Sequence, residues 1–163
     1  MADTNIKFYI QIEDGTLYDL ETGWTIIGSG SEPSSKILYS KCTGLLNKGK
    51  RADIHTETYA DCDEIRIWLG DKIVREPTTI TLSLYFTGRY RQDVFKSFMR
   101  TVENQKVSYW DTARLKKAYM VLIDAVTITE DVYNGSTPYM LCEFKFQNLW
   151  GECKDCDVKG NIK

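Results

Sequence analysis

The sequence predicts a mainly β fold, a sandwich or barrel of antiparallel strands that carries one amphipathic helix. Segments with apolar side chains at every second position recur along the chain, and this spacing is typical of half-buried strands. One segment, Arg91–Glu103, instead has the apolar spacing of a helix. The strands do not alternate regularly with helices, as they would around a parallel sheet.

The first half of the chain predicts few regular elements. Residues 6–14 alternate apolar and polar side chains and predict a strand. Residues 15–56 are rich in Gly, Ser and Thr, and we expect a loop-rich excursion there. Within and after this excursion we expect short strands around Trp24–Ile27 and Lys36–Ser40, an exposed turn tip at Asn47–Arg51, and a strand at Glu64–Gly70.

Residues 78–149 predict the core of the fold. Thr79–Gly88 alternates strictly and ends at a glycine, which predicts an amphipathic strand. The helix at about 91–103 follows, with Val94, Phe95, Phe98, Met99 and Val102 on its apolar stripe. Further strands are expected at Lys106–Asp111, Ala118–Asp131 and Tyr139–Trp150. We therefore expect a single domain over residues 1–150 and a polar C-terminal tail over residues 151–163.

Charge is distributed unevenly although the formal net charge of the 163 residues is only −2. Residues 89–117 contain eight basic and three acidic side chains, so the rest of the chain carries the compensating acid. Such a chain can bind nucleic acid or dock against copies of itself, and a solvated helix face is the simpler interpretation. Acids interleave with the bases along this segment, which disfavours a nucleic-acid-binding stripe.

The N-terminus has neither the basic nor the apolar region of a secretory signal, so we expect none. The apolar runs are far shorter than the roughly 18 residues of a membrane span. The chain contains five cysteines, an odd number, and no export signal is expected. We therefore expect reduced thiols, made in the cytoplasm.

The sequence gives only weak indications of a metal site or a redox site. Cys153 and Cys156 have CxxC spacing, but a structural zinc site needs four ligands, and the remaining cysteines are isolated. His55 is the single histidine and lies in a polar, acidic segment where solvation is the simpler interpretation. No phosphate-binding glycine motif is present, so we expect no nucleotide and no cofactor.

Trp110, Asp111 and Arg114 lie close together in sequence and could form a carboxylate site. Hydrolysis by paired carboxylates needs a second acid with a shifted pKa, and the nearest one, Asp124, lies among apolar neighbours on an expected strand. We expect Asp111 instead to form a turn, to hydrogen-bond nearby backbone and to pair with Arg114. We predict no catalytic residue and no enzymatic activity.

The segment from Thr78 to Leu149 carries a resemblance. A strand enters the helix through Gly88 and Arg89, a short strand bearing Tyr109 and Trp110 follows, and the last strand contains Phe144-Lys145-Phe146. This order resembles the tail-tube-like β-sandwich of bacteriophage tail proteins, most closely the distal tail (or tail tube) proteins of siphophages. The resemblance covers under half of the chain, and no residue of the 15–56 region contributes to it.

The resemblance implies a structural protein of the virion, without reaction or small-molecule substrate. Copies would close into a ring, usually hexameric, that stacks with other tail rings in the tube or baseplate. DNA would pass through the channel during genome ejection without sequence-specific binding. The protein would be made in the bacterial host cytoplasm and reside in the virion tail. On this interpretation, contacts with neighbours are expected from Arg89, Arg91, Arg100 and Lys106, facing outward, and from Trp68, Tyr85 and Tyr119.

A different class of function stays open. The chain could be a small binding or adaptor module, monomeric or dimeric, with zinc held in its cysteine-containing tail by Cys153 and Cys156. The two interpretations differ in the size of the particle in solution, because only the first requires a ring.

Overall fold

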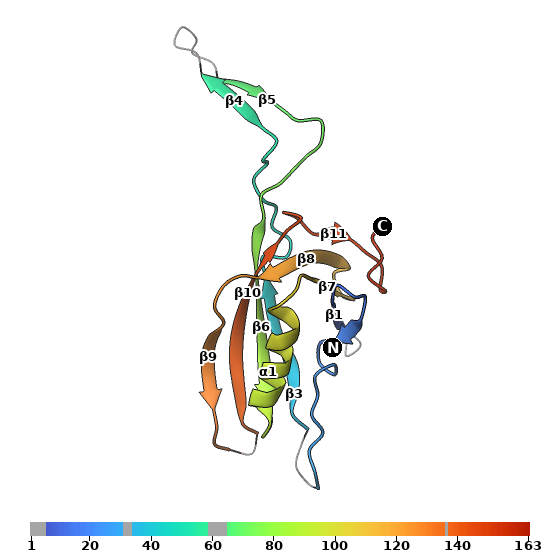
Figure 1. Ribbon diagram of the computed structural model, residues 1–163, viewed down its shortest axis with the longest axis vertical. Coiled ribbons are helices and arrows are strands. Elements are labelled where there is room, and N and C mark those ends of the chain that lie inside the picture. The colour runs from blue at the N-terminus through green and yellow to red at the C-terminus, as the bar shows by residue number, and fades with distance from the viewer. Residues whose placement is uncertain (1–5, 31–33, 59–64, 136) are drawn as a thin grey trace.

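The computed structural model describes residues 6–30, 34–58, 65–135 and 137–163. One helix and eleven strands occur in these residues (Figure 1). In chain order they are β1 (Phe8–Gln11), β2 (Leu17–Asp19), β3 (Lys36–Thr43), β4 (His55–Thr58), β5 (Ile65–Trp68), β6 (Thr78–Thr87), α1 (Arg91–Val102), β7 (Val107–Asp111), β8 (Lys116–Leu122), β9 (Thr127–Val132), β10 (Tyr139–Asn148) and β11 (Lys154–Asp155).

One antiparallel sheet of nine strands makes up the body. Its strands follow the order β2-β1-β7-β8-β10-β6-β3, and β11 and β9 pair with β8 and β10. β10 pairs with β6 along its whole length, while its other edge pairs with β9 in its first half and with β8 in its second. The prediction of a mainly β fold with antiparallel strands and one helix is confirmed. The sheet does not close into a barrel.

The core lies between α1 and the sheet, as the sequence periodicity predicts. Even-numbered residues of β6 and β10, from Ile80 to Phe86 and from Met140 to Phe146, are buried. α1 packs Phe98 onto them, with its ring 5.1 Å from that of Phe144 and 6.0 Å from that of Phe86. Burying such aromatic side chains contributes most of the driving force for this packing. α1 thereby covers one face of the sheet and leaves the other without a helix.

The strand expected at Ala118–Asp131 is two strands, and this prediction is wrong. β8 ends at Leu122 and β9 begins at Thr127, and exposed residues from Ile123 to Ala125 join them. The break lets β8 leave β10 at Phe146 and lets β9 return along the first half of β10. The apolar alternation runs through the break, so periodicity alone does not reveal it.

The first half of the chain contains more paired β-strands than its composition predicts. β1 and β3 confirm two expected strands, but Trp24–Ile27 forms only the isolated bridge of Ile26 with Ser35, so the short strand expected there is absent. β2 lies in the segment expected to be mostly loop, residues 15–56, and β4 begins at its end. β4 and β5 form a separate two-stranded sheet. Residues 51–75, which contain it, are called the arm below, and Figure 1 shows the arm extending beyond the ends of β6 and β10.

The C-terminal segment, residues 151–163, folds onto the body. β11 pairs with β8, and Cys156 bridges Ile162. The indole Nε1 of Trp110 donates a hydrogen bond to the Val158 carbonyl oxygen at 3.4 Å, and Lys117 Nζ donates one to the Gly160 carbonyl oxygen at 2.8 Å. The segment is polar, as expected, yet it covers the fully buried ring of Trp110.

Candidate self-association surfaces

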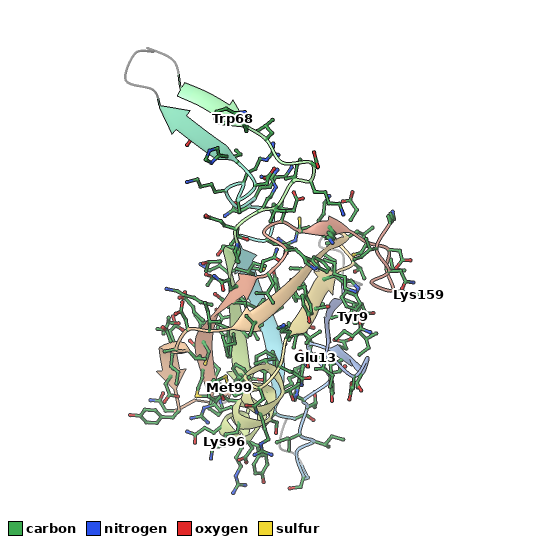
Figure 2. All side chains as sticks on the ribbon, turned by 45° about the horizontal axis from the view of Figure 1, so that its top comes forward. Tyr9, Glu13, Trp68, Lys96, Met99 and Lys159 are labelled. Atoms are coloured by element: carbon green, nitrogen blue, oxygen red, sulfur yellow. The ribbon has the colours of Figure 1, made fainter. Side chains whose placement is uncertain are left out.

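The arm is the most prominent surface feature. Figure 2 shows Trp68 on it, far from Lys96 and Met99 of α1. In the described residues β4 and β5 pair only with each other, from His55 opposite Trp68 to Thr58 opposite Ile65. A two-stranded hairpin is marginally stable by itself in water. The arm therefore depends on its attachment to the body or on a partner.

Asp53 holds the two sides of the arm together near its base. Its carboxylate accepts hydrogen bonds from Arg51 Nε at 3.0 Å, from the Gly70 N–H at 3.1 Å and from the Val74 N–H at 3.3 Å. The Arg51 guanidinium holds the pKa of this carboxyl well below its usual range. Asp53 is consequently ionised at neutral pH, and its charge strengthens these hydrogen bonds.

The turn after β10 anchors the base of the arm to the body. The Gly49 N–H donates a hydrogen bond to the Gly151 carbonyl oxygen at 2.7 Å. Arg75 donates from Nη1 to the Gly49 carbonyl oxygen at 3.0 Å, and its Nε lies 3.4 Å from Glu152 Oε2. These contacts place Asn47–Arg51 at the base of the arm and not at the tip of a turn, so that part of the expectation is wrong, although residues 47, 48 and 50 are exposed as expected. The arm projects from a fixed base.

The two edges of the sheet region under α1 carry opposite charge. β9 pairs only with β10 and β3 pairs only with β6 among the described strands, so neither has a strand on its outer edge, although the Tyr39 N–H of β3 donates to Glu21 Oε1 at 3.3 Å. β9 exposes Glu130 and Asp131, and β3 exposes Lys36 and Lys41. Free strand edges readily pair with another chain. An acidic edge and a basic edge on one chain are complementary between copies.

The sheet face that points away from α1 is polar. Side chains on this face include Tyr85 and Tyr139, whose rings contact edge to face at 5.6 Å, and the Tyr139 hydroxyl donates to Glu130 Oε2 at 3.0 Å. Lysine and glutamate both occur on it. Thr79, Thr81, Ser83, Glu143 and Lys145 share this face by the register of β6 and β10.

The basic residues predicted as contacts divide into two groups. Arg89 and Arg100 are exposed, and so is Lys106 just after α1. Arg91 does not face outward, because its side chain is only 12% exposed and its Nη2 lies 3.6 Å from Asp131 Oδ1 of β9. The prediction that Arg91 points toward a neighbour is therefore wrong. Arg91 instead forms an ion pair within the chain, between α1 and β9.

The aromatic residues predicted as contacts lie on three separate surfaces. Trp68 is on the arm and is 43% exposed. Tyr85 lies on the polar sheet face. Tyr119 is half-buried on β8, where its ring stacks on that of Trp150 at 5.8 Å. The structure therefore does not bring the predicted contact residues into one patch.

Asp111 and Arg114 form the turn that the sequence predicts. The Asp111 carboxylate is buried and accepts from the Arg114 N–H at 2.6 Å and from Arg114 Nε at 3.0 Å. This confirms the structural interpretation of Asp111. Asp124 is exposed between β8 and β9, so the expectation that it lies on a strand is wrong.

The histidine, cysteine and tyrosine side chains considered next show no sign of a catalytic role. His55 is exposed on the arm, opposite Trp68, with the two rings 5.4 Å apart. Burial raises the pKa of the Cys42 thiol and of the Tyr109 hydroxyl, which pack near Arg114, so both are protonated at neutral pH. Neither is an activated nucleophile.

The cysteines expected as weak metal candidates lie on either side of β11. Cys156 is fully buried beneath the C-terminal segment, and Cys153 is half-buried against the core. Within residues 6–30, 34–58, 65–135 and 137–163, no three His, Cys, Asp or Glu side chains are grouped so that they could hold a metal ion. Cys62 lies outside the described residues.

No known family matches the chain, and no curated protein matches it. No helix in the described part of the chain has the length and apolar character needed to cross a membrane.

Sequence reasoning missed the acidic edge of β9 and the apolar arm. The sequence pattern places Glu130 and Asp131 in one long strand, and periodicity does not identify which edge of a strand stays unpaired. A signal for the arm does exist in Ile67-Trp68-Leu69, because three consecutive apolar residues place large side chains on both faces of a strand. Both faces of a short exposed strand become apolar when partners cover them.

Proposed function

We propose that this chain is a structural protein of a bacteriophage tail, whose copies close into a ring, hexameric as in the family it resembles, around the DNA channel. The ring would stack with other tail rings as a distal tail, tube or adaptor component. The protein would be made in the host cytoplasm and reside in the virion. This role requires no catalysis, cofactor or small-molecule substrate.

The observation that carries the proposal is the pair of free edges with opposite charge. Glu130 of β9 on one copy would face Lys36 and Lys41 of β3 on the next, while Asp131 stays paired with Arg91 of its own chain. Because the two edges differ, the contact is head-to-tail, and a head-to-tail contact either closes a ring or grows a filament. Edge pairing also removes the aggregation hazard of unpaired strands.

The position of α1 supports a channel on the opposite face of the sheet. α1 carries the exposed cations Lys96 and Arg100, and it packs on the face buried in the core. The other face mixes Thr, Ser, Tyr, Glu and Lys side chains. A channel wall of mixed polarity would let DNA slide, since each cation that contacts phosphate adds salt-dependent affinity.

The experiment that tests the proposal measures particle mass against concentration, by light scattering coupled to chromatography, followed by negative-stain imaging. We expect annular particles. Lys41→Glu and Glu130→Lys should each weaken them, and the two substitutions combined in one chain should restore them. Lys159→Glu, which makes the same charge change on the exposed C-terminal segment, should have no effect.

The results separate the proposal from the adaptor alternative. A chain that stays monomeric or dimeric at the highest attainable concentration, with no dependence on the charge of the β3 and β9 edges, contradicts the ring. If rings form and neither single edge substitution weakens them, the chain self-assembles, but not through the β3 and β9 edges.

A further inference from the structure

The turn between β9 and β10 contains the single Asn-Gly pair of the sequence, Asn134-Gly135. Both residues are exposed, and Gly135 has φ of +102° with no atom within 4 Å of the position of an added Cβ. No described residue is hydrogen-bonded to the Asn134 side chain or accepts a hydrogen bond from the Gly135 N–H. The side-chain amide and the backbone nitrogen are therefore open to solvent and to each other.

The two residues of such a pair can react with each other. When the backbone nitrogen of the following residue reaches the asparagine Cγ, a five-membered succinimide ring closes. A side chain on the following residue hinders this approach, and glycine has none. Glycine also lets the backbone adopt conformations that other residues rarely reach. An exposed turn, which is not held by the hydrogen bonds of a sheet, is where this ring closes most easily.

The other asparagines of the described chain lack one or more of these features. Asn47, Asn104 and Asn161 are exposed, but the residue after each carries a long or branched side chain. Asn104 Nδ2 in addition donates a hydrogen bond to the Arg100 carbonyl oxygen at 3.2 Å. Asn148 is fully buried in β10. The chain thus provides its own internal controls for the reactivity of Asn134.

We propose that Asn134 is a site of spontaneous deamidation, which converts the turn into a mixture of aspartate and isoaspartate forms. The Gly135 nitrogen loses its proton to solvent and attacks Asn134 Cγ. The N–Cγ bond forms, the Cγ–Nδ2 bond breaks, and ammonia leaves with a proton from water. Water then hydrolyses the succinimide, at Cγ to give aspartate or at the main-chain carbonyl carbon to give isoaspartate. The reaction consumes one water molecule and needs no oxidant or reductant.

Conversion changes both the charge and the backbone of the turn. Either product adds a carboxylate, ionised at neutral pH, beyond Glu130 at the end of β9. Isoaspartate also inserts a methylene group into the main chain, next to the Tyr139–Val132 pair at which the two strands meet. The Pro138 carbonyl oxygen in this connection accepts a hydrogen bond from the Gly88 N–H at 2.9 Å. The Gly88 amide therefore reports on the geometry of the turn.

This inference goes beyond the proposed function and does not depend on it. The reaction needs only the turn and water, so it proceeds in a chain that forms rings and in one that stays monomeric. Failure of the ring proposal leaves the deamidation site standing, and failure of deamidation leaves the ring standing.

Peptide mapping of the aged protein tests the proposal. The folded full-length chain is incubated at neutral pH in heavy-oxygen water, digested in ordinary water and analysed by mass spectrometry. We expect the peptide that contains Asn134 to become acidic and to carry one heavy oxygen from the hydrolysis step. Peptides that contain Asn104 and Asn161 should not change. A methyltransferase specific for isoaspartate should label the aged chain and leave the fresh chain unlabelled.

Two variants serve as matched controls. Asn134→Gln should show no conversion, because its ring closure would need a six-membered ring. Gly135→Ala should convert several-fold more slowly than wild type, because the methyl group hinders attack, although it meets no atom of the folded chain. The NMR signal of the Gly88 amide should split as the wild-type chain ages and should stay single in Asn134→Gln.

Three results would overturn the proposal. The first is a wild-type Asn134 peptide that does not change during incubation. The second is an acidic peptide without heavy oxygen, because that reaction would have occurred during digestion and not in the folded protein. The third is equal conversion at Asn104 or Asn161, or in Gly135→Ala, because neither the turn nor its glycine would then select the site.

Discussion

The buried hydroxyl of Ser35 accepts a hydrogen bond from the Tyr90 N–H at 2.8 Å, and this bond joins the start of β3 to the start of α1. Gly88 makes the approach possible. It has φ of +95°, and a Cβ there would lie 2.4 Å from Ser35 Oγ and 2.8 Å from Ser35 Cα. The turn between β6 and α1 therefore needs glycine for its conformation and for its space.

Gly88→Ala should destabilise the fold by about 2–5 kcal/mol, since left-handed backbone costs about 1–2 kcal/mol and overpacking costs about 1–3 kcal/mol. Gly135→Ala is the matched control, because Gly135 has φ of +102° and no atom within 4 Å of an added Cβ. Chemical denaturation measures both. Equal losses of stability in the two variants would show that contact with Ser35 contributes nothing.

The sequence predicts the part of the fold in which local periodicity and packing agree. β6, α1 and β10 were predicted nearly to their ends, because Phe86, Phe98 and Phe144 follow the spacing of strand and helix and meet in one core. The break at Ile123–Ala125 could not be predicted, since it depends on which half of β10 each strand joins. The prediction that Arg91 faces outward is wrong for a similar reason. Its partner Asp131 comes from β9, a strand distant in sequence, and local periodicity carries no information about such a contact.

Arg114→Met should destabilise the protein by about 2–4 kcal/mol, because it leaves the Asp111 carboxylate buried without its guanidinium partner. The loss should be smaller than for a wholly buried pair, since the Arg114 side chain is 30% exposed. Lys116→Met removes the exposed ion pair with Asp155 and should leave stability nearly unchanged, because solvent screens exposed ion pairs. Denaturant titration of both variants checks the difference, and a reversed order would contradict the role of Asp111.

The base of the arm should keep its hydrogen bonds well below neutral pH. The pKa of Asp53 is lowered chiefly by its hydrogen bonds from Arg51. A carboxyl with a depressed folded-state pKa contributes stability above its unfolded pKa of about 3.9, and loses that contribution as pH falls through the folded value. The amide proton shifts of Gly70 and Val74, followed by NMR, should therefore titrate with a midpoint below 3.8.

Two variants test this assignment. In Arg51→Met the midpoint should rise, because the guanidinium no longer favours the ionised carboxyl. In Asp53→Asn the two amide shifts should not titrate in this range. A wild-type midpoint of about 4 or higher would contradict the electrostatic account of the arm base.

Gly160→Ala should loosen the C-terminal segment from the body. Gly160 has φ of +84°, and a Cβ there would lie 2.4 Å from the Trp110 ring. Strain of about 1–2 kcal/mol, together with this overlap, should raise the population of the open segment roughly tenfold or more, since 1.4 kcal/mol is a factor of ten. Cys156, which is fully buried beneath this segment, should then react with a thiol reagent at least about tenfold faster.

The labelled cysteine is identified by peptide mass. Gly15→Ala is the control, because Gly15 has φ of +92° with open space around it and lies far along the chain from the C-terminal segment. In that variant Cys156 should react at the wild-type rate. Buried Cys142, whose pKa burial raises to about 12, should remain slow in all three proteins, because its thiolate is scarce and the core covers it. Rapid labelling of Cys156 in the wild-type chain would show instead that the C-terminal segment opens readily without strain at Gly160.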